Sequence, residues 1–217
     1  MSYQAVIVET RVVPGMKELL FNFFYFLGTQ WNFVIYCSPS NKEYMEECTE
    51  RIPGVTIKPV VMQKEFSFRD YNNMLTDKKF WMNLSAEKIL IFQHDCKLLR
   101  HGIDRFLKFD YVGAPWKVDH IDMEGGNGGL SIRSRQKMID VIEKFPFDAS
   151  KHGNEDVYFC KHLPLVGGKL PNNQYATEFS VETVFYPKPI GIHAAWRYLN
   201  KEQYLKIIET AFNEIFQ

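Results

Sequence analysis

The sequence predicts an α/β fold with a largely parallel central sheet, because strand patterns alternate with helical patterns along its first half. Residues 5–8 form a short, mostly β-branched run, which predicts a buried strand. Pro14 and Gly15 mark a turn, after which residues 16–27 predict a helix that covers the sheet. Residues 33–36 predict the second strand.

The same alternation continues up to a strand that ends in polar residues. We predict helices over residues 42–51 and 71–84 and a strand over residues 55–61. Residues 88–92 give the clearest strand pattern, because they are apolar as a central parallel strand must be. Gln93, His94 and Asp95 follow directly, and open α/β sheets bind ligands at this carboxyl edge.

The composition limits the classes of function. The chain has 217 residues, which fits one domain, and its 46% hydrophobic and 24% charged residues are typical of a protein with a packed core. The formal net charge is zero, which argues against a nucleic-acid-binding protein that uses a broad basic face. Aromatic residues make up 15% of the chain, and composition alone leaves open whether some rings stack on a base or a sugar or all lie in the core.

Cysteine spacing and hydropathy predict a soluble protein of a reducing compartment. The four cysteines lie far apart and form no C-x-x-C pair, so neither a zinc site nor a disulfide framework is expected. The first residues lack the basic region and long apolar run of a signal peptide. The longest apolar stretch, residues 19–27, is too short to span a bilayer. We therefore expect a cytoplasmic location and no membrane span.

Two polar residues are candidates for holding a metal ion. Asp95 at the end of a central strand can hold Mg²⁺ or Mn²⁺ against a diphosphate, although an acid at this place can also cap the following loop. His193 follows Pro187 and Pro189, which predict a loop that returns across the sheet edge. Its imidazole could complete the metal shell, and the alternative is a structural histidine.

Two further stretches combine glycine or acid residues with a helix start. Residues 124–134 contain four glycines in five positions, which suit either a phosphate-binding loop or a flexible turn, and residues 134–144 predict a helix. The spacing matches neither common phosphate-binding motif. Glu155 and Asp156 open an amphipathic segment, where acids complement the helix dipole. Alternatively, one of them is a general base that deprotonates a hydroxyl.

Eight stretches in order carry a family resemblance across nearly the whole chain. They are AVIVETR, YNNML followed by FW, KILIFQHD, DYVGAPW, GNGGLSIRSR, NEDVYF, FSVE and GIHAAW. With them the chain resembles a domain-of-unknown-function family of predicted GT-A-type glycosyltransferases found in giant viruses, fungi, algae and some bacteria. The order of GGLSIRS, EDVYF and IGIH is more distantly similar to the fringe and β-1,3-galactosyltransferase group.

The resemblance implies a GT-A-like nucleotide-diphospho-sugar transferase fold, a single Rossmann-like domain over residues 1–217 with a mixed, mostly parallel sheet. Its donor-binding part would span about residues 1–115 and its acceptor and catalytic part about residues 116–200. The implied reaction moves a sugar from a nucleotide-sugar donor, UDP-linked by preference, to a hydroxyl of a glycan or another acceptor. It would invert the anomeric centre and use Mn²⁺ or Mg²⁺.

The resemblance also assigns roles by position. Asp156 is the expected catalytic base, with Glu155 as its neighbour and substitute candidate, and Asp95 and His193 are the expected metal ligands. Gln93 stands where the family's Asp-x-Asp motif has its first acid, so we expect weaker metal binding. The implied donor-binding residues are Glu9, Thr10, Arg11, Asn72, Asn73, His94, Asp95, Gly128 and Gly129.

Two other functions compete with this interpretation. A sugar-1-phosphate nucleotidylyltransferase usually carries a glycine-rich, basic loop directly after its first strand, and residues 9–15 contain no such run. A non-catalytic glycan-binding module would not need Asp95, Asp156 and His193 together. Neither alternative requires a nucleic-acid partner, and the neutral chain predicts none.

Overall fold

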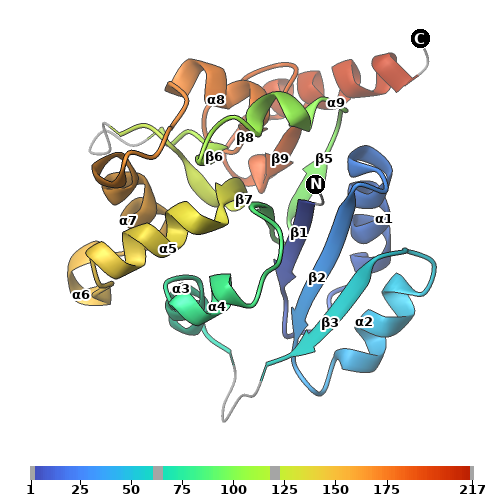
Figure 1. Ribbon diagram of the computed structural model, residues 1–217. Coiled ribbons are helices and arrows are strands. Elements are labelled where there is room, and N and C mark those ends of the chain that lie inside the picture. Colours follow the sequence, from blue (N-terminus) through green and yellow to red (C-terminus); the bar gives the residue numbers. More distant parts are fainter. Residues whose placement is uncertain (1–2, 61–65, 118–122, 216–217) are drawn as a thin grey trace.

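A six-stranded sheet forms the centre of the protein, with the strand order β3-β2-β1-β4-β7-β6 (Figure 1). The computed structural model describes residues 3–60, 66–117 and 123–215. The neighbouring strands β1 to β4 are parallel, and β7 runs antiparallel to both β4 and β6. The strands are β1 (Tyr3–Val8), β2 (Trp31–Cys37), β3 (Val55–Pro59), β4 (Lys88–Phe92), β6 (Tyr111–Ala114) and β7 (Asn127–Ser134). The predicted α/β fold with a mixed, mostly parallel sheet is therefore confirmed.

Helices cover both faces of this sheet, as Figure 1 shows. On β4, Leu90 and Phe92 pack into the core beneath α1, whereas Ile89 and Ile91 point into the core on the opposite face. This burial on both faces explains the continuous apolar pattern of the strand. One face is covered by α1 (Met16–Leu27) and α2 (Lys42–Thr49), and the other by α3 (Phe68–Leu75), α4 (Lys78–Met82), α5 (Arg135–Lys144) and α7 (Glu155–His162).

A second, three-stranded sheet with the order β5-β9-β8 begins directly after the turn that ends β4. The strand β5 (Cys96–Leu98) pairs antiparallel with β9 (Gly191–His193), which brings His193 opposite Cys96 and next to Asp95. The strand β8 (Ser180–Val181) pairs parallel with β9. The other elements are α6 (Ala149–His152), α8 (Asn173–Phe179), α9 (Lys201–Ile215) and short 3₁₀ helices at Ile103–Phe106, Leu163–Val166 and Ala195–Arg197.

Several predicted elements are confirmed, and one helix is divided. The strand at 88–92 and the helix at 16–27 have the predicted bounds, and the predicted helix at 134–144 is α5 with Ser134 at its N-cap. The predicted helix at 71–84 is two helices, because Asp77 accepts the Lys79 N–H and starts α4. The strand predicted at 55–61 ends at Pro59, and its last residue lies outside the described residues.

The glycine-rich stretch is a buried strand, so both predicted alternatives, a phosphate-binding loop and a flexible turn, were wrong for most of it. Residues 127–134 form β7 between β4 and β6. A Cβ atom at Gly128 would lie 2.4 Å from Glu155 Oε1, and one at Gly129 would lie 2.3 Å from His193 Nε2. These glycines therefore let two other segments pack directly on the strand. The loop predicted around His193 is also wrong, since that residue ends β9.

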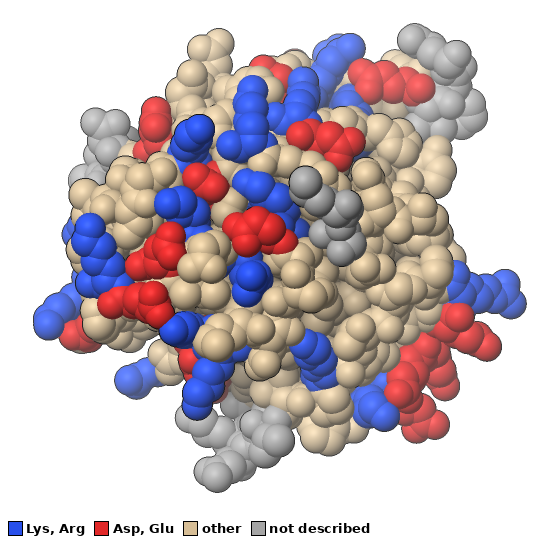
Figure 2. All heavy atoms as spheres, viewed as in Figure 1, with Lys and Arg blue, Asp and Glu red and all other residues tan. Residues whose placement is uncertain are grey.

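The surface and the helices bear on two expectations from composition. Figure 2 shows Lys and Arg interspersed with Asp and Glu on the visible face, so no single sign of charge dominates this face. Among the described residues, no helix is both long enough and apolar enough to cross a membrane. The four cysteines, Cys37, Cys48, Cys96 and Cys160, are buried and carry free thiols.

Candidate active site

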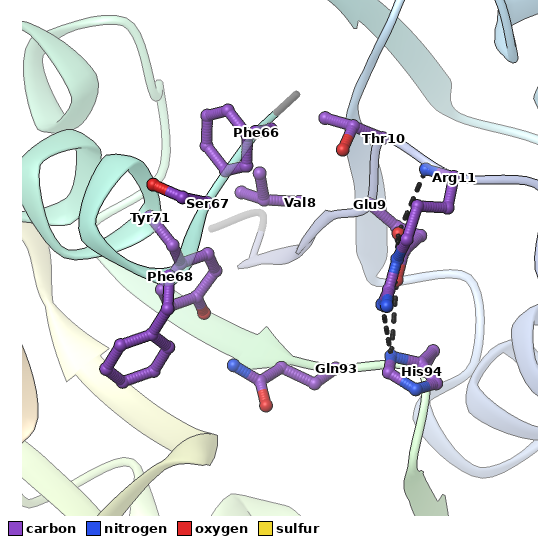
Figure 3. Close-up of a pocket in the computed structure, with 10 residues that line it drawn as sticks. All are labelled: Val8, Glu9, Thr10, Arg11, Phe66, Ser67, Phe68, Tyr71, Gln93 and His94. Atoms are coloured by element: carbon purple, nitrogen blue, oxygen red, sulfur yellow. Dashed lines mark hydrogen bonds and ion pairs between the residues drawn. The ribbon is translucent and has the colours of Figure 1, made fainter. Parts of the chain in front are cut away.

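Two adjoining cavities lie at the carboxyl ends of the parallel strands. The first has a volume of about 290 Å³ and lies between the ends of β1 and β4 and the start of α3 (Figure 3). The second, of about 210 Å³, lies between the end of β4, the start of β7, the start of α7 and β9. Both cavities are lined by Phe68, Tyr71 and Gln93, which therefore stand at their junction.

A charged network forms one wall of the first cavity. The Glu9 carboxylate is almost fully buried and accepts hydrogen bonds from Arg11 Nε and Nη2, both at 2.8 Å, and from the Arg11 backbone N–H at 3.0 Å. His94 Nδ1 lies 3.2 Å from Glu9 Oε2. Burial raises the pKa of Glu9, but the bonds from Arg11 and His94 outweigh it and hold the pKa at about 2. Glu9 is therefore ionised and fixes the Arg11 guanidinium beside the cavity.

The structure brings most of the expected donor-binding residues together, but not Asn73. Glu9, Thr10, Arg11 and His94 line the first cavity. Asp95, Gly128, Gly129 and Asn72 line the second. The Asn72 amide is already engaged, because its Oδ1 accepts the Glu155 N–H at 2.9 Å and its Nδ2 donates to the Phe68 carbonyl. Asn73 is exposed and is not among the described residues that line either cavity.

Asp95 and His193 face each other in the second cavity. The Ala194 N–H donates to the Asp95 carbonyl at 2.9 Å, and His193 Nε2 lies 3.3 Å from Asp95 Oδ1. Asp95 Oδ1 and His193 Nδ1 are buried and make no aligned hydrogen bond to any residue that the structure describes. Each atom nevertheless faces a group of opposite charge, because Oδ1 lies beside the His193 ring and Nδ1 lies 3.1 Å from Glu182 Oε1. A buried polar atom without an aligned hydrogen bond calls for an explanation, and a bound ion is one. These two residues, with Cys96, have ligand atoms within 4.8 Å of one another.

The chemistry of Cys96 separates it from the other two residues. Its thiol donates to the Gly129 carbonyl at 3.0 Å and accepts the Gln93 N–H at 3.3 Å. Burial raises the pKa of Cys96 well above its usual value, so the thiol stays protonated. Mg²⁺ and Mn²⁺ prefer oxygen ligands and Mn²⁺ also accepts imidazole, whereas a protonated thiol suits neither ion. The residues that fit such an ion are therefore Asp95 and His193.

His193 lies between two carboxylates, and sequence analysis did not identify the second. Its Nδ1 is 3.1 Å from Glu182 Oε1, and its Nε2 is 3.2 Å from Gln93 Oε1. Burial lowers the pKa of His193, but Asp95 and Glu182 outweigh it and raise the pKa to about 9. A divalent cation bound at Nε2 would have to replace a proton, as is usual for histidine ligands.

Asp156 lies in the first turn of α7 with its carboxylate at the second cavity. Its Oδ2 accepts the Gly128 N–H at 3.1 Å, and its Oδ1 accepts the Val157 N–H at 2.8 Å. Burial, helped by the adjacent Glu155 charge, raises the pKa of Asp156 to about 6. A carboxylate with a pKa in this range is suited to accept a proton near neutral pH.

Glu155 is committed to a buried ion pair with Arg133. Arg133 Nη2 donates to Glu155 Oε1 at 2.9 Å, and Nη1 donates to Oε2. The Arg133 side chain is 0% exposed, and its guanidinium carbon lies 4.8 Å from the Tyr111 ring centre and 5.6 Å from that of Phe159. Arg133 was not among the predicted site residues, and the signal in the sequence was a charged side chain among the small and apolar residues of Asn127–Ser134.

Comparison with protein families gives one match. A family described as "Protein of unknown function (DUF5672)" matches residues 56–193, which is more than half of the 217 residues. The chain belongs to this family. No curated protein matches the sequence.

Solved structures of glycosyltransferases resemble this DUF5672 chain in fold. Mouse xyloside xylosyltransferase 1 superimposes with a TM-score of 0.60 at 8% identity, over 92% of this chain and 100% of that one. The mannosyltransferase PcManGT of Pyrobaculum calidifontis, solved with GDP-Man and Mn²⁺, gives a TM-score of 0.56 at 13% identity over 79% of this chain. The glycosyltransferase GlyE of Streptococcus pneumoniae gives a TM-score of 0.54 at 11% identity over 100% of this chain.

The low identities mean that these similarities establish the fold alone, which is the GT-A nucleotide-sugar transferase fold. The matched region is 63% of the GlyE chain and 55% of the PcManGT chain. The chemistry of the DUF5672 chain must therefore be argued from its own residues.

Proposed function

We propose that the protein is a glycosyltransferase that moves a sugar from a nucleotide-sugar donor to a hydroxyl of a glycan or another acceptor. The observation that carries the proposal is one cavity lined both by Asp156, whose pKa is about 6, and by the facing pair of Asp95 and His193. Glycosyl transfer needs a proton acceptor for the attacking hydroxyl and a means of stabilising the leaving diphosphate. The GT-A fold of the chain agrees with this reaction class.

Asp95 and His193 are proposed to hold Mn²⁺ or Mg²⁺, because Asp95 Oδ1 is buried without an aligned hydrogen bond and His193 Nε2 lies 3.3 Å from it at the second cavity. When bound, such an ion stabilises the negative charge that develops on the leaving diphosphate. Gln93 offers an amide oxygen in place of a carboxylate. Because this ligand is neutral, the ion should bind more weakly here than at a site with two acids. The PcManGT structure, which has the same fold, was solved with Mn²⁺, and this supports a divalent cation in the proposed reaction.

Asp156 is proposed to accept the proton of the acceptor hydroxyl as that oxygen attacks the anomeric carbon. Attack from the face opposite the diphosphate would invert this carbon. The two N–H groups that bind Asp156 hold its carboxylate in place. The Arg133 ion pair engages both oxygens of Glu155, which supports Asp156 rather than Glu155 as the base.

The nucleotide is proposed to occupy the first cavity, with UDP as the expected form. The described residues that line this cavity all come from the proposed donor-binding part, about residues 1–115 of a single domain. Asp156 and His193 belong to the part proposed for acceptor binding and catalysis, about residues 116–200. The fixed Arg11 guanidinium supplies positive charge at the nucleotide site.

A thermal-shift panel tests the proposal. We expect one class among UDP-, GDP- and dTDP-sugars to raise the melting temperature, with a larger rise in the presence of Mn²⁺, because a ligand that binds only the folded state stabilises it. Circular dichroism would verify that the sample is folded. The absence of a shift with every nucleotide sugar would contradict the transferase and favour a glycan-binding module.

Glu182 is expected to orient His193 for the metal. Replacing Glu182 with alanine should weaken Mn²⁺ binding by about 10- to 100-fold, the usual effect of losing a carboxylate behind a metal-binding histidine. Electron paramagnetic resonance of free Mn²⁺ measures this affinity. Val181→Ala is the matched control, because it removes packing from the same small sheet and keeps the carboxylate. Equal losses of affinity in the two variants would assign Glu182 a purely structural role.

A further inference from the structure

Tyr71 presents a buried hydroxyl at the junction of the two cavities. It lies in α3, whose start is fixed by a capping box between Ser67 and Asp70. The Tyr71 side chain lines both cavities, and the residue is only 9% exposed. Its hydroxyl makes no aligned hydrogen bond to any group in the described ranges. The Gln93 side chain is close enough to donate to the hydroxyl oxygen and so oppose the rise in pKa, but such a contact leaves the O–H donor of Tyr71 unused. Burial raises the pKa of Tyr71, so the hydroxyl keeps its proton and remains a donor.

A buried hydroxyl without a partner destabilises the free protein, because the group has lost its water and gained no bond in exchange. A phenylalanine of nearly the same shape would avoid that cost. Tyr111 shows the usual arrangement, since its buried hydroxyl donates to the Gly126 carbonyl at 2.9 Å. Tyr36 also has an unpaired hydroxyl, but Tyr71 combines this with a place at the junction of two cavities, and that combination points to a partner outside the protein.

The position of Tyr71 identifies the part of the ligand that it meets. Across the first cavity from Tyr71 stand Glu9, Arg11 and His94, while Gln93 lies between the two sides (Figure 3). The second cavity holds Asp95, His193 and Asp156. A donor with its nucleoside in the first cavity and its sugar near Asp156 must pass its diphosphate through the junction.

We infer that the Tyr71 hydroxyl donates a hydrogen bond to a diphosphate oxygen of the nucleotide-sugar donor. This inference rests on the proposed function, because it assumes that a nucleotide diphosphate spans the two cavities. It also changes which residue of the YNN sequence serves the donor. Asn72 is engaged with Glu155 and Phe68, Asn73 is exposed, and Tyr71 is the residue with an unused donor at the site.

Tyr71→Phe removes only the hydroxyl and tests the inference directly. By isothermal titration calorimetry with UDP and GDP, we expect the variant to bind the preferred diphosphate about tenfold more weakly than wild type. Binding of the corresponding nucleoside, uridine or guanosine, should be unchanged, since it has no diphosphate. The melting temperature of the free variant should equal or exceed that of wild type, because an unsatisfied buried group has been removed.

Tyr36→Phe and Tyr111→Phe are the matched controls. Tyr36 also has a buried hydroxyl without a partner, but it is not among the described residues that line either cavity. Its variant should match Tyr71→Phe in stability and bind UDP and GDP like wild type. Tyr111→Phe should melt at a lower temperature, because it loses a formed hydrogen bond.

Three results would overturn the inference, and they are distinct. Equal diphosphate affinity of wild type and Tyr71→Phe would show that the hydroxyl does not meet the donor. A melting temperature lowered as far as in Tyr111→Phe would show that the hydroxyl has a partner within the protein. Failure of folded wild-type protein to bind either diphosphate would refute the proposed function itself, and the inference with it.

Discussion

Replacing Asp156 with asparagine is expected to lower turnover by about 10²- to 10⁴-fold, the usual contribution of general-base catalysis. Nucleotide binding should be unchanged, because Asp156 lines the second cavity and not the first among the residues described. Steady-state kinetics of sugar transfer, with donor affinity measured separately by calorimetry, would check both parts. Normal turnover in this variant would remove Asp156 from the role of base.

The pH dependence of wild type provides an internal control for this prediction. The raised pKa of Asp156 is about 6, so its carboxylate is protonated below that pH and ionised above it. Turnover should therefore rise as the pH increases through about 6 and then level off. In Asp156→Asn, the remaining activity should lack this rise.

The same pKa shift predicts how this substitution affects stability. A carboxyl whose pKa is higher in the folded state binds its proton more tightly there, so its contribution to stability decreases as the pH rises from about 4 to above 6. At neutral pH the folded protein bears the cost of a buried charge at Asp156. The uncharged asparagine variant avoids that cost but loses one of the two backbone bonds, because its amide nitrogen cannot accept an N–H. These two effects oppose each other, so its melting temperature should stay close to that of wild type, and a large fall would mean that lost activity reflects misfolding.

The parts of the fold that sequence analysis predicted correctly are those determined by local pattern. Residues 88–92 are apolar because the strand is buried on both faces, and that requirement is visible without knowing which helices cover it. The helix at 16–27 follows its turn residues in the same way. Asp95 was a candidate because the carboxyl end of a central strand is a recurrent ligand site.

Features that depend on distant contacts could not be predicted from local pattern. Glycine usually signals a flexible or turning backbone, but Gly128 and Gly129 are required because Glu155 and His193 pack against them. Glu182 was visible only as part of a matching stretch, since its contact with His193 depends on the pairing of β8 with β9. The role inferred for Tyr71 likewise depends on two cavities that meet only in the folded chain.

Arg133→Met is expected to lower the free energy of unfolding by about 3–5 kcal/mol, because it leaves the Glu155 carboxylate buried without its partner. Both side chains are almost fully buried, so solvent cannot replace the lost interaction. Urea unfolding monitored by circular dichroism would measure the change. A loss below about 1 kcal/mol, the usual value for an exposed pair, would contradict the importance assigned to this contact.

Combining Arg133→Met with Glu155→Leu should restore most of that stability, since well-packed apolar side chains can replace a buried ion pair. The double variant also tests whether Glu155 or Asp156 accepts the proton. It lacks the Glu155 carboxylate but keeps Asp156. Losing the Glu155 charge lowers the pKa of Asp156 and losing the Arg133 charge raises it, and the Glu155 effect is the larger, so the pKa should fall. The pH at which turnover rises should therefore shift downwards while turnover at neutral pH stays well above that of Asp156→Asn. If the folded double variant were as inactive as Asp156→Asn at every pH, Glu155 would have to take part in proton transfer, and the assignment of Asp156 as the sole base would fail.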